Sequence, residues 1–190
     1  YNISLAKIAR IFNPLDVLNC KAVDRHQART AIEISPRAQV VICHGRIEIH
    51  RKGLDILIAA WEQVCRDRPD RDLCLLLIGT GSDAEQLHQL IAAKQLTSVV
   101  WIDEYVQDRS LIQQYLSAAD LYTLSSRHEG FPVAPLEAMA CRLPVVATRV
   151  SGIADILEGE TISGGLIVPS EDAAALAQAI GQVLDNQTLR

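Results

Sequence analysis

The sequence predicts an α/β domain in which one parallel sheet of about six strands lies between two layers of helices. Three observations support this prediction. Short apolar runs alternate with longer amphipathic stretches from residue 38 onward, the connections between them are short, and residues 73–78 are apolar throughout. A fully apolar strand is typical of a parallel sheet covered on both faces. Such an arrangement is Rossmann-like and has three layers.

The expected elements alternate regularly along the chain. Apolar residues spaced for one helical face, such as Leu54, Leu57 and Trp61, identify the helices, and short aliphatic runs identify the strands. In chain order we expect a strand at 38–43, a helix at 54–64, a strand at 73–78, a helix at 87–91, a strand at 99–102, a helix at 111–116, a strand at 121–124, a helix at 132–141, strands at 145–147 and 166–168, and a helix at 176–184.

Length and composition limit the class of protein. The chain has 190 residues, of which 49% are hydrophobic, and a net charge of −5. The apolar content excludes disorder, and the acidic balance argues against a nucleic-acid partner. No apolar run approaches the length of a membrane span, the amino-terminal residues do not resemble a secretory signal, and the five cysteines form no C-x-x-C pair. We therefore expect a soluble cytoplasmic domain at 38–190, preceded by a more polar lead-in or interdomain segment at 1–37.

Basic residues follow the first expected strand. Gly45 and Arg46 come directly after it, and Lys52 lies at the start of the next helix. In a parallel sheet, ligands collect at the carboxyl ends of the strands. Cations at that place suit a diphosphate, because arginine donates forked hydrogen bonds and lysine supplies a mobile charge. Ordinary surface charge is the alternative interpretation of these residues.

A second group of polar residues lies between the strand at 121–124 and the helix at 132–141. Unpaired backbone N–H groups in the first turn of that helix, which begins with Pro132, favour an anion. Glu129 precedes the helix and Glu137 lies within it. A carboxylate beside a phosphate site requires a hydroxyl-rich ligand, although two surface glutamates around a loop would give the same pattern.

Other polar patterns predict no metal site. Asp70 and Asp72 form a D-x-D sequence, but they precede their strand and would lie at the wrong end of the sheet. The histidines have no ligand spacing. We expect His44 to be a packed core residue, whereas His128, beside Glu129, is a candidate for the site.

Taken together, these motifs resemble the retaining GT-B glycosyltransferases of family 4, the group 1 glycosyl transferases. The spacing of Glu129 and Glu137 resembles the E-x7-E motif of that family. Further matching segments follow in the family's order over about residues 38–185. They are Gly45-Arg46, Lys52-Gly53, Gly79-x-Gly81, Ala119-Asp120, 126–131, 137–140, 144–147 and 165–169.

The resemblance implies that residues 38–190 form the nucleotide-sugar-binding domain, which is the C-terminal half of a GT-B fold. It implies that Arg46 and Lys52 grip the donor diphosphate, that Glu129 faces the sugar, and that Glu137 faces the ribose. Arg46, Lys52 and Glu129 are the expected catalytic residues. The remaining expected donor-binding residues are Gly45, Tyr105, Val106, His128, Gly130, Phe131, Pro132, Val133 and Ala134, with Tyr105 and Val106 near the base.

The same resemblance implies a reaction. It is the metal-independent transfer, with retention, of a hexose from a UDP-sugar such as UDP-glucose to a sugar or lipid-linked acceptor in polysaccharide biosynthesis. The family also has an acceptor-binding N-terminal half, here supplied in cis or in trans, which allows peripheral association with the cytoplasmic face of a membrane. Two alternatives remain: a donor-binding module without catalysis of its own, and an epimerase that uses the same fold and donor.

Overall fold

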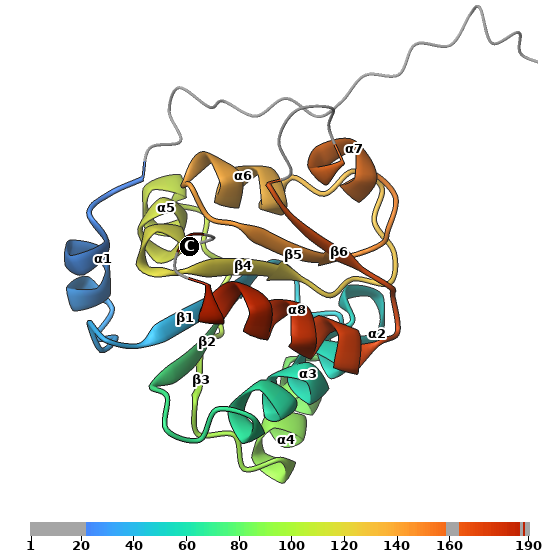
Figure 1. The fold of residues 1–190 in the computed structure, drawn as a ribbon, viewed down its shortest axis with the longest axis horizontal. Helices are drawn as coiled ribbons and strands as arrows, with labels where there is room; N and C mark the ends of the chain where they lie inside the picture. Colours follow the sequence, from blue (N-terminus) through green and yellow to red (C-terminus); the bar gives the residue numbers. More distant parts are fainter. Residues whose placement is uncertain (1–21, 159–163, 187, 189–190) are drawn as a thin grey trace, which may run out of the picture.

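Six parallel strands form one sheet through the centre of the molecule, in the order β3-β2-β1-β4-β5-β6 (Figure 1). The computed structural model describes residues 22–158, 164–186 and 188. The strands are β1 (Gln39–His44), β2 (Leu73–Ile78), β3 (Val99–Ile102), β4 (Leu121–Leu124), β5 (Val145–Thr148) and β6 (Gly165–Val168). The predicted parallel sheet of six strands is confirmed.

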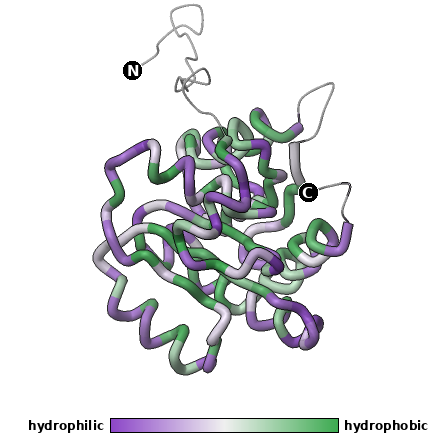
Figure 2. The backbone as a smooth tube through the Cα atoms, turned by 90° about the vertical axis from the view of Figure 1, so that its left-hand side faces the viewer, coloured by the Kyte–Doolittle hydropathy of each residue, from purple (hydrophilic) through white to green (hydrophobic). Residues whose placement is uncertain are grey.

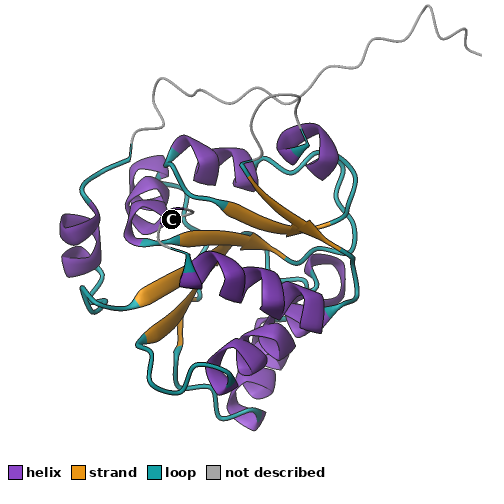
Figure 3. Cartoon of the chain, viewed as in Figure 1, coloured by secondary structure: helices purple, strands orange, loops and turns teal. Residues whose placement is uncertain are grey.

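Helices cover both faces of this sheet (Figure 3). They are α1 (Arg25–Ala31), α2 (Ile49–Lys52), α3 (Leu54–Arg66), α4 (Ala84–Ala93), α5 (Arg109–Ala118), α6 (Ala134–Ala140), α7 (Ile153–Leu157) and α8 (Ala173–Asp185). The five predicted helices correspond to α3, α4, α5, α6 and α8. The short helices α1, α2 and α7 were not expected, because four to seven residues do not carry a clear helical repeat.

Two hydrophobic cores separate the layers. Leu75 and Leu77 of β2 pack into the core beneath α3, α4 and α8, whereas Leu76 and Ile78 pack into the core beneath α5, α6 and α7. Alternate side chains of a strand point to opposite faces, so a strand buried on both sides must be apolar throughout. Figure 2 shows the same arrangement, with hydrophobic stretches through the middle of the chain trace and hydrophilic stretches frequent at its periphery.

The strand order reverses at the centre of the sheet. β1 pairs with β2 on one side and with β4 on the other, so that Val41 lies opposite both Leu75 and Leu121. The segments that leave β1 and β4 therefore diverge, one toward α2 and one toward α6. A crevice at such a switch point is the usual ligand site of an open α/β sheet.

Residues 22–37 contain α1, which packs against α5. The buried side chain of Arg29 donates to Asp120 Oδ2 at 2.8 Å and to the carbonyl of Ala118 at 2.8 Å. Residues 1–21 of the predicted lead-in lie outside the described residues. Within the described part of the chain, no helix has the length and apolar character needed to cross a membrane.

Candidate active site

Two adjoining cavities open at the carboxyl end of the sheet, between the β1–α2 and β4–α6 segments. The first has a volume of about 200 Å³ and the second about 430 Å³. The two cavities share five lining residues: His44, Gly45, Arg46, Ile78 and Val133. Because these shared residues form a common border, the two cavities are parts of one cleft.

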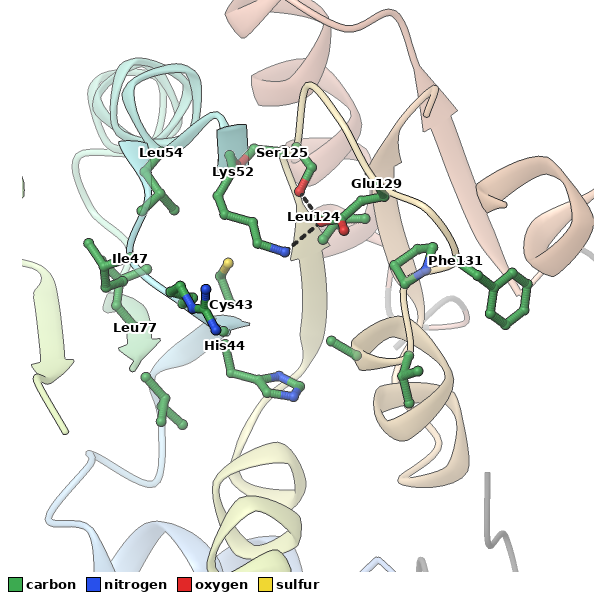
Figure 4. Close-up of a pocket in the computed structure, with 17 residues that line it drawn as sticks. Cys43, His44, Ile47, Lys52, Leu54, Leu77, Leu124, Ser125, Glu129 and Phe131 are labelled. Atoms are coloured by element: carbon green, nitrogen blue, oxygen red, sulfur yellow. Dashed lines mark hydrogen bonds and ion pairs between the residues drawn. The ribbon is translucent and has the colours of Figure 1, made fainter. Parts of the chain in front are cut away.

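An ion pair crosses the first cavity (Figure 4). Lys52 Nζ lies 2.7 Å from Glu129 Oε1, and the Ser126 hydroxyl donates to the same oxygen at 2.7 Å. Only 7% of the Glu129 side chain and 21% of the Lys52 side chain are exposed. A carboxylate this deeply buried requires a charged or hydrogen-bonding partner, and here it has both.

A close contact between two backbone segments fixes the position of Lys52. Lys52 is the last residue of α2, and Gly53 follows it with φ 59°, a left-handed conformation. A Cβ atom on Gly53 would lie 2.0 Å from the Ser125 carbonyl oxygen, so only glycine fits. The Ser125 hydroxyl also donates to the Lys52 carbonyl at 2.9 Å. These contacts hold α2 directly against the segment that carries Glu129.

Arg127 braces the same two segments. Its guanidinium forms a bidentate pair with Asp55 at 2.7 and 2.8 Å, donates to the His50 carbonyl at 2.9 Å, and contacts Glu171 at 2.5 Å. Burial alone would raise the pKa of Asp55, but the hydrogen bonds and charge of Arg127 lower it on balance. Hydrogen bonds with both carboxylates raise the pKa of Arg127. The brace therefore stays charged.

Arg46 lies where the two cavities meet. Its side chain is 70% exposed and contacts Glu48 at 3.3 Å. Arg51 pairs with the other oxygen of Glu48 at 3.0 Å but lines neither cavity. Arg46 is thus an accessible cation at the centre of the cleft, and Arg51 is a nearby cation outside it.

A second carboxylate reaches the cleft from α6. Glu137 lines the second cavity, and its Oε2 lies 3.0 Å from Nε2 of His44, the last residue of β1. Hydrogen bonding with His44 lowers the pKa of Glu137, and it outweighs burial, which acts in the opposite direction. The expectation that His44 is only a packed core residue was wrong, because the ring lines both cavities and contacts Glu137. Its position at the carboxyl end of a strand, next to Gly45, was the signal for a role in the site.

The far end of the second cavity is formed by the segment between β3 and α5. Tyr105 and Val106 line it, together with Glu104 and Arg109, and Tyr105 is 77% exposed. Neither Glu104 nor Arg109 was predicted from the sequence as a site residue. They follow β3, at the same edge of the sheet as Gly45.

The amino-terminal end of α6 faces the first cavity. Phe131, Pro132, Val133 and Ala134 all line it. The helix begins at Ala134, so the proline in its first turn is Pro135 and not Pro132 as expected. Of the predicted site residues, His128 and Gly130 line neither cavity, whereas all the others line at least one.

Two further sequence patterns can now be placed. A Cβ atom on Gly79 would lie 1.9 Å from the Gly45 carbonyl oxygen, so the Gly79–Gly81 segment is a close-packed turn, and Gly79 and Thr80 line the second cavity. Asp70 and Asp72 precede β2 and therefore lie at the opposite end of the sheet from the cleft. Among the residues that the structure describes, no group of three or more His, Cys, Asp or Glu side chains is arranged to hold a metal ion.

The part of the chain that contains these residues matches a known sequence family. Its profile, described as glycosyl transferases group 1, covers residues 38–186. The chain belongs to this family. The six-stranded sheet is Rossmann-like, and its neighbours among the solved structures are GT-B glycosyltransferases.

Curated relatives of this glycosyl transferases group 1 domain are glycosyltransferases. The lipopolysaccharide core biosynthesis mannosyltransferase LpsB of Rhizobium meliloti is 29% identical over 86% of this chain and 46% of its own length. A D-inositol 3-phosphate glycosyltransferase of Pseudarthrobacter chlorophenolicus is 34% identical over 87% of this chain and 39% of its own length. The chain spans less than half the length of these relatives.

A solved structure supports the same relationship. HepE from Anabaena, in complex with UDP and glucose, aligns with a TM-score of 0.79 and 26% identity over 94% of this chain and 48% of that chain. Sucrose-phosphate synthase from Thermosynechococcus elongatus aligns with a TM-score of 0.73 and 30% identity over 88% of this chain and 41% of that chain.

Proposed function

We propose that this domain binds a UDP-hexose donor, such as UDP-glucose, for a retaining and metal-independent glycosyltransferase. The observation that carries the proposal is the arrangement of charge along one cleft. Arg46 and Lys52 enter it from the β1–α2 segment, and Glu129 and Glu137 enter it from the β4–α6 segment. The cations suit a diphosphate, and the carboxylates suit the hydroxyl groups of the two sugars on either side of it.

The size of the cavities supports an assignment for each part of the donor. In this proposal the hexose occupies the first cavity near Glu129, the diphosphate lies at the border beside Arg46, and the nucleoside occupies the larger cavity between Glu137 and Tyr105. The acceptor would then bind to a further part of the enzyme, in cis or in trans, that also determines any contact with a membrane.

The reaction requires charge stabilisation on both products of bond cleavage. As the bond between the sugar and the phosphate oxygen breaks and a bond to an acceptor oxygen forms, positive charge develops on the sugar and negative charge on the leaving diphosphate. Fixed cations stabilise the diphosphate, and removal of one such contact typically raises the barrier by about 3–4 kcal/mol. Lys52 has three N–H donors, so it can keep Glu129 as a partner while donating to a phosphate oxygen. Glu129, already partly neutralised, can then orient a sugar hydroxyl without repelling the diphosphate.

The choice of a uridine nucleotide rests on the solved relatives. HepE structures are described as complexes with UDP and with UDP-glucose, and the latter aligns with a TM-score of 0.80. The base in this chain would contact the Tyr105–Val106 segment, where Tyr105 offers an exposed aromatic ring.

A binding experiment tests the donor site directly. Calorimetric titration of the chain with UDP, GDP and ADP, with and without EDTA, should give the tightest binding for UDP and no effect of the chelator. Arg46→Ala should weaken UDP binding about tenfold or more, whereas Arg51→Ala should change it less than about twofold. Both arginines pair with Glu48, but only Arg46 lines the cleft. Equal effects of the two substitutions, or no binding of any nucleotide, would contradict the proposal.

Transfer assays on a protein that includes an acceptor-binding half distinguish the proposed enzyme from a donor-binding module without catalysis of its own. Glu129→Gln should retain UDP binding within a few fold and lower hexose transfer by about a hundredfold or more. Donor binding without any transfer by the native protein would favour a binding module. Product analysis by NMR tests retention at the transferred sugar.

A further inference from the structure

His44 occupies an unusual position at the end of β1. Its ring lies on the border between the two cavities and makes an edge-on contact with Tyr122, with ring centroids 5.4 Å apart. Tyr122 Oη also donates to the His44 carbonyl at 3.5 Å. Only 11% of the side chain is exposed. Packing therefore fixes the ring, and with it the direction in which Nε2 points.

The two ring nitrogens have different surroundings. Nε2 lies 3.0 Å from Glu137 Oε2, whereas Nδ1 is buried and has no hydrogen-bond partner among the described residues. A neutral ring with its proton on Nε2 satisfies this arrangement best, because it donates to the carboxylate and buries no N–H group without an acceptor. An unpaired buried polar atom lowers the stability of the fold. A leucine would fill this place without that penalty, so stability alone does not explain a histidine here.

We infer that His44 is a positioning residue for the nucleoside, and this inference rests on the proposed donor site. The ring fixes one oxygen of Glu137 and thereby orients the carboxylate toward the second cavity. There it can accept hydrogen bonds from the vicinal hydroxyls of a ribose. His44 thus determines the preference for a ribonucleotide over a 2′-deoxyribonucleotide.

The chemistry of imidazole suits this role better than that of a cation. Lys52 neutralises Glu129 by pairing with it, which lowers the charge available to a ligand. The His44 ring contacts Glu137 through Nε2 alone, with a single hydrogen bond to Oε2. Hydroxyl groups are donors, and a hydrogen bond to a charged acceptor is about twice as strong as one between neutral groups. The second cavity therefore keeps a fixed carboxylate acceptor, and Arg109 is a cation in the same lining.

A comparison of sugar preference separates positioning from general stabilisation. Calorimetry measures the affinity of the tightest-binding nucleoside diphosphate among UDP, GDP and ADP, and of its 2′-deoxy counterpart, for each variant. The native chain should prefer the ribonucleotide about tenfold or more. His44→Leu should reduce this preference to about twofold. His44→Gln, which retains an N–H donor, should restore most of it.

The matched control is His88→Gln. His88 Nε2 also lies near a carboxylate, that of Asp103 at 3.2 Å, but His88 lines neither cavity. This substitution should leave the preference unchanged. A purely structural role for His44 predicts that His44→Leu weakens both nucleotides equally and keeps their ratio; that result, or a native chain without sugar preference, would overturn the inference. A chain that binds no nucleotide would overturn the proposed function as well, so the two failures are distinguishable.

Discussion

Glu129 and Glu137 are eight residues apart in one segment, and each has a partner from the β1–α2 segment. Glu129 pairs with the Lys52 ammonium group and is almost fully buried, whereas Glu137 contacts the His44 ring and keeps 29% of its side chain exposed. In the first pair, the charge of Lys52 balances that of Glu129 within the protein. In the second pair, His44 holds the Glu137 carboxylate in place where it lines the larger cavity.

The two pairs therefore have different roles within one cleft. The Lys52–Glu129 pair lines the smaller cavity, and each charge has its partner within the protein. The His44–Glu137 contact borders a cavity of about 430 Å³, whose walls are partly exposed. We therefore expect substitutions at the first pair to affect folding stability most, and substitutions at the second to affect ligand preference most.

The largest expected effect is that of Lys52→Ala. The substitution leaves the Glu129 carboxylate, 7% exposed, with the Ser126 hydroxyl but no counter-charge. Removal of one partner of a buried pair typically costs 3–5 kcal/mol, and we expect about 3 kcal/mol because Lys52 is not fully buried. Urea unfolding measures this change.

The double variant Lys52→Ala with Glu129→Gln provides the control. A neutral amide no longer needs a counter-charge and can still accept from Ser126, so at least half of the lost stability should return. Additive losses in the double variant would show that the pair is not the source of the effect, and the comparison with Glu137 would lose its basis.

Arg127→Ala should have a smaller effect, about 1–2 kcal/mol. The substitution removes the buried cation, and the two carboxylates that remain are 42% and 60% exposed, so water can solvate them. Arg149→Ala is the matched control, because Arg149 forms an exposed pair with Glu158, and it should change the unfolding free energy by less than about 0.5 kcal/mol. Equal losses from the two substitutions in urea unfolding would argue against a brace at Arg127.

The sequence predicted the fold more completely than the contacts of the site. Continuous apolar runs such as 73–78 identified the strands, because burial on both faces leaves few other residue types. The spacing of Glu129 and Glu137 led to the cleft through the family resemblance. The partners of these residues were not predicted, because the Lys52–Glu129 contact joins positions 77 residues apart. Nothing in the local pattern distinguishes His44 from a core residue; only its place at the end of β1 does.

For His44→Leu we expect a change in unfolding free energy of less than about 1 kcal/mol. The loss of the contact with Glu137 is offset, since the partly exposed carboxylate can be hydrated and the unpaired Nδ1 is removed. Urea unfolding of this variant, beside that of Lys52→Ala, tests the comparison directly. A loss as large as that of Lys52→Ala would mean that both pairs serve mainly to stabilise the fold.

The smallest expected effect is on the pH dependence of stability. The pKa of Glu137 is lowered in the folded state, chiefly by the hydrogen bond with His44. A carboxyl whose pKa is lowered on folding stabilises the fold at pH values above its pKa in the unfolded chain. This contribution is lost as the pH falls through the lower pKa of the folded state. Glu137→Gln should therefore reduce the loss of stability measured by urea unfolding between neutral and acidic pH. In a His44→Leu background the same substitution should change the pH dependence less, because the main cause of the shift is already absent. An equal change in both backgrounds would show that the Glu137 carboxylate is held by groups other than His44.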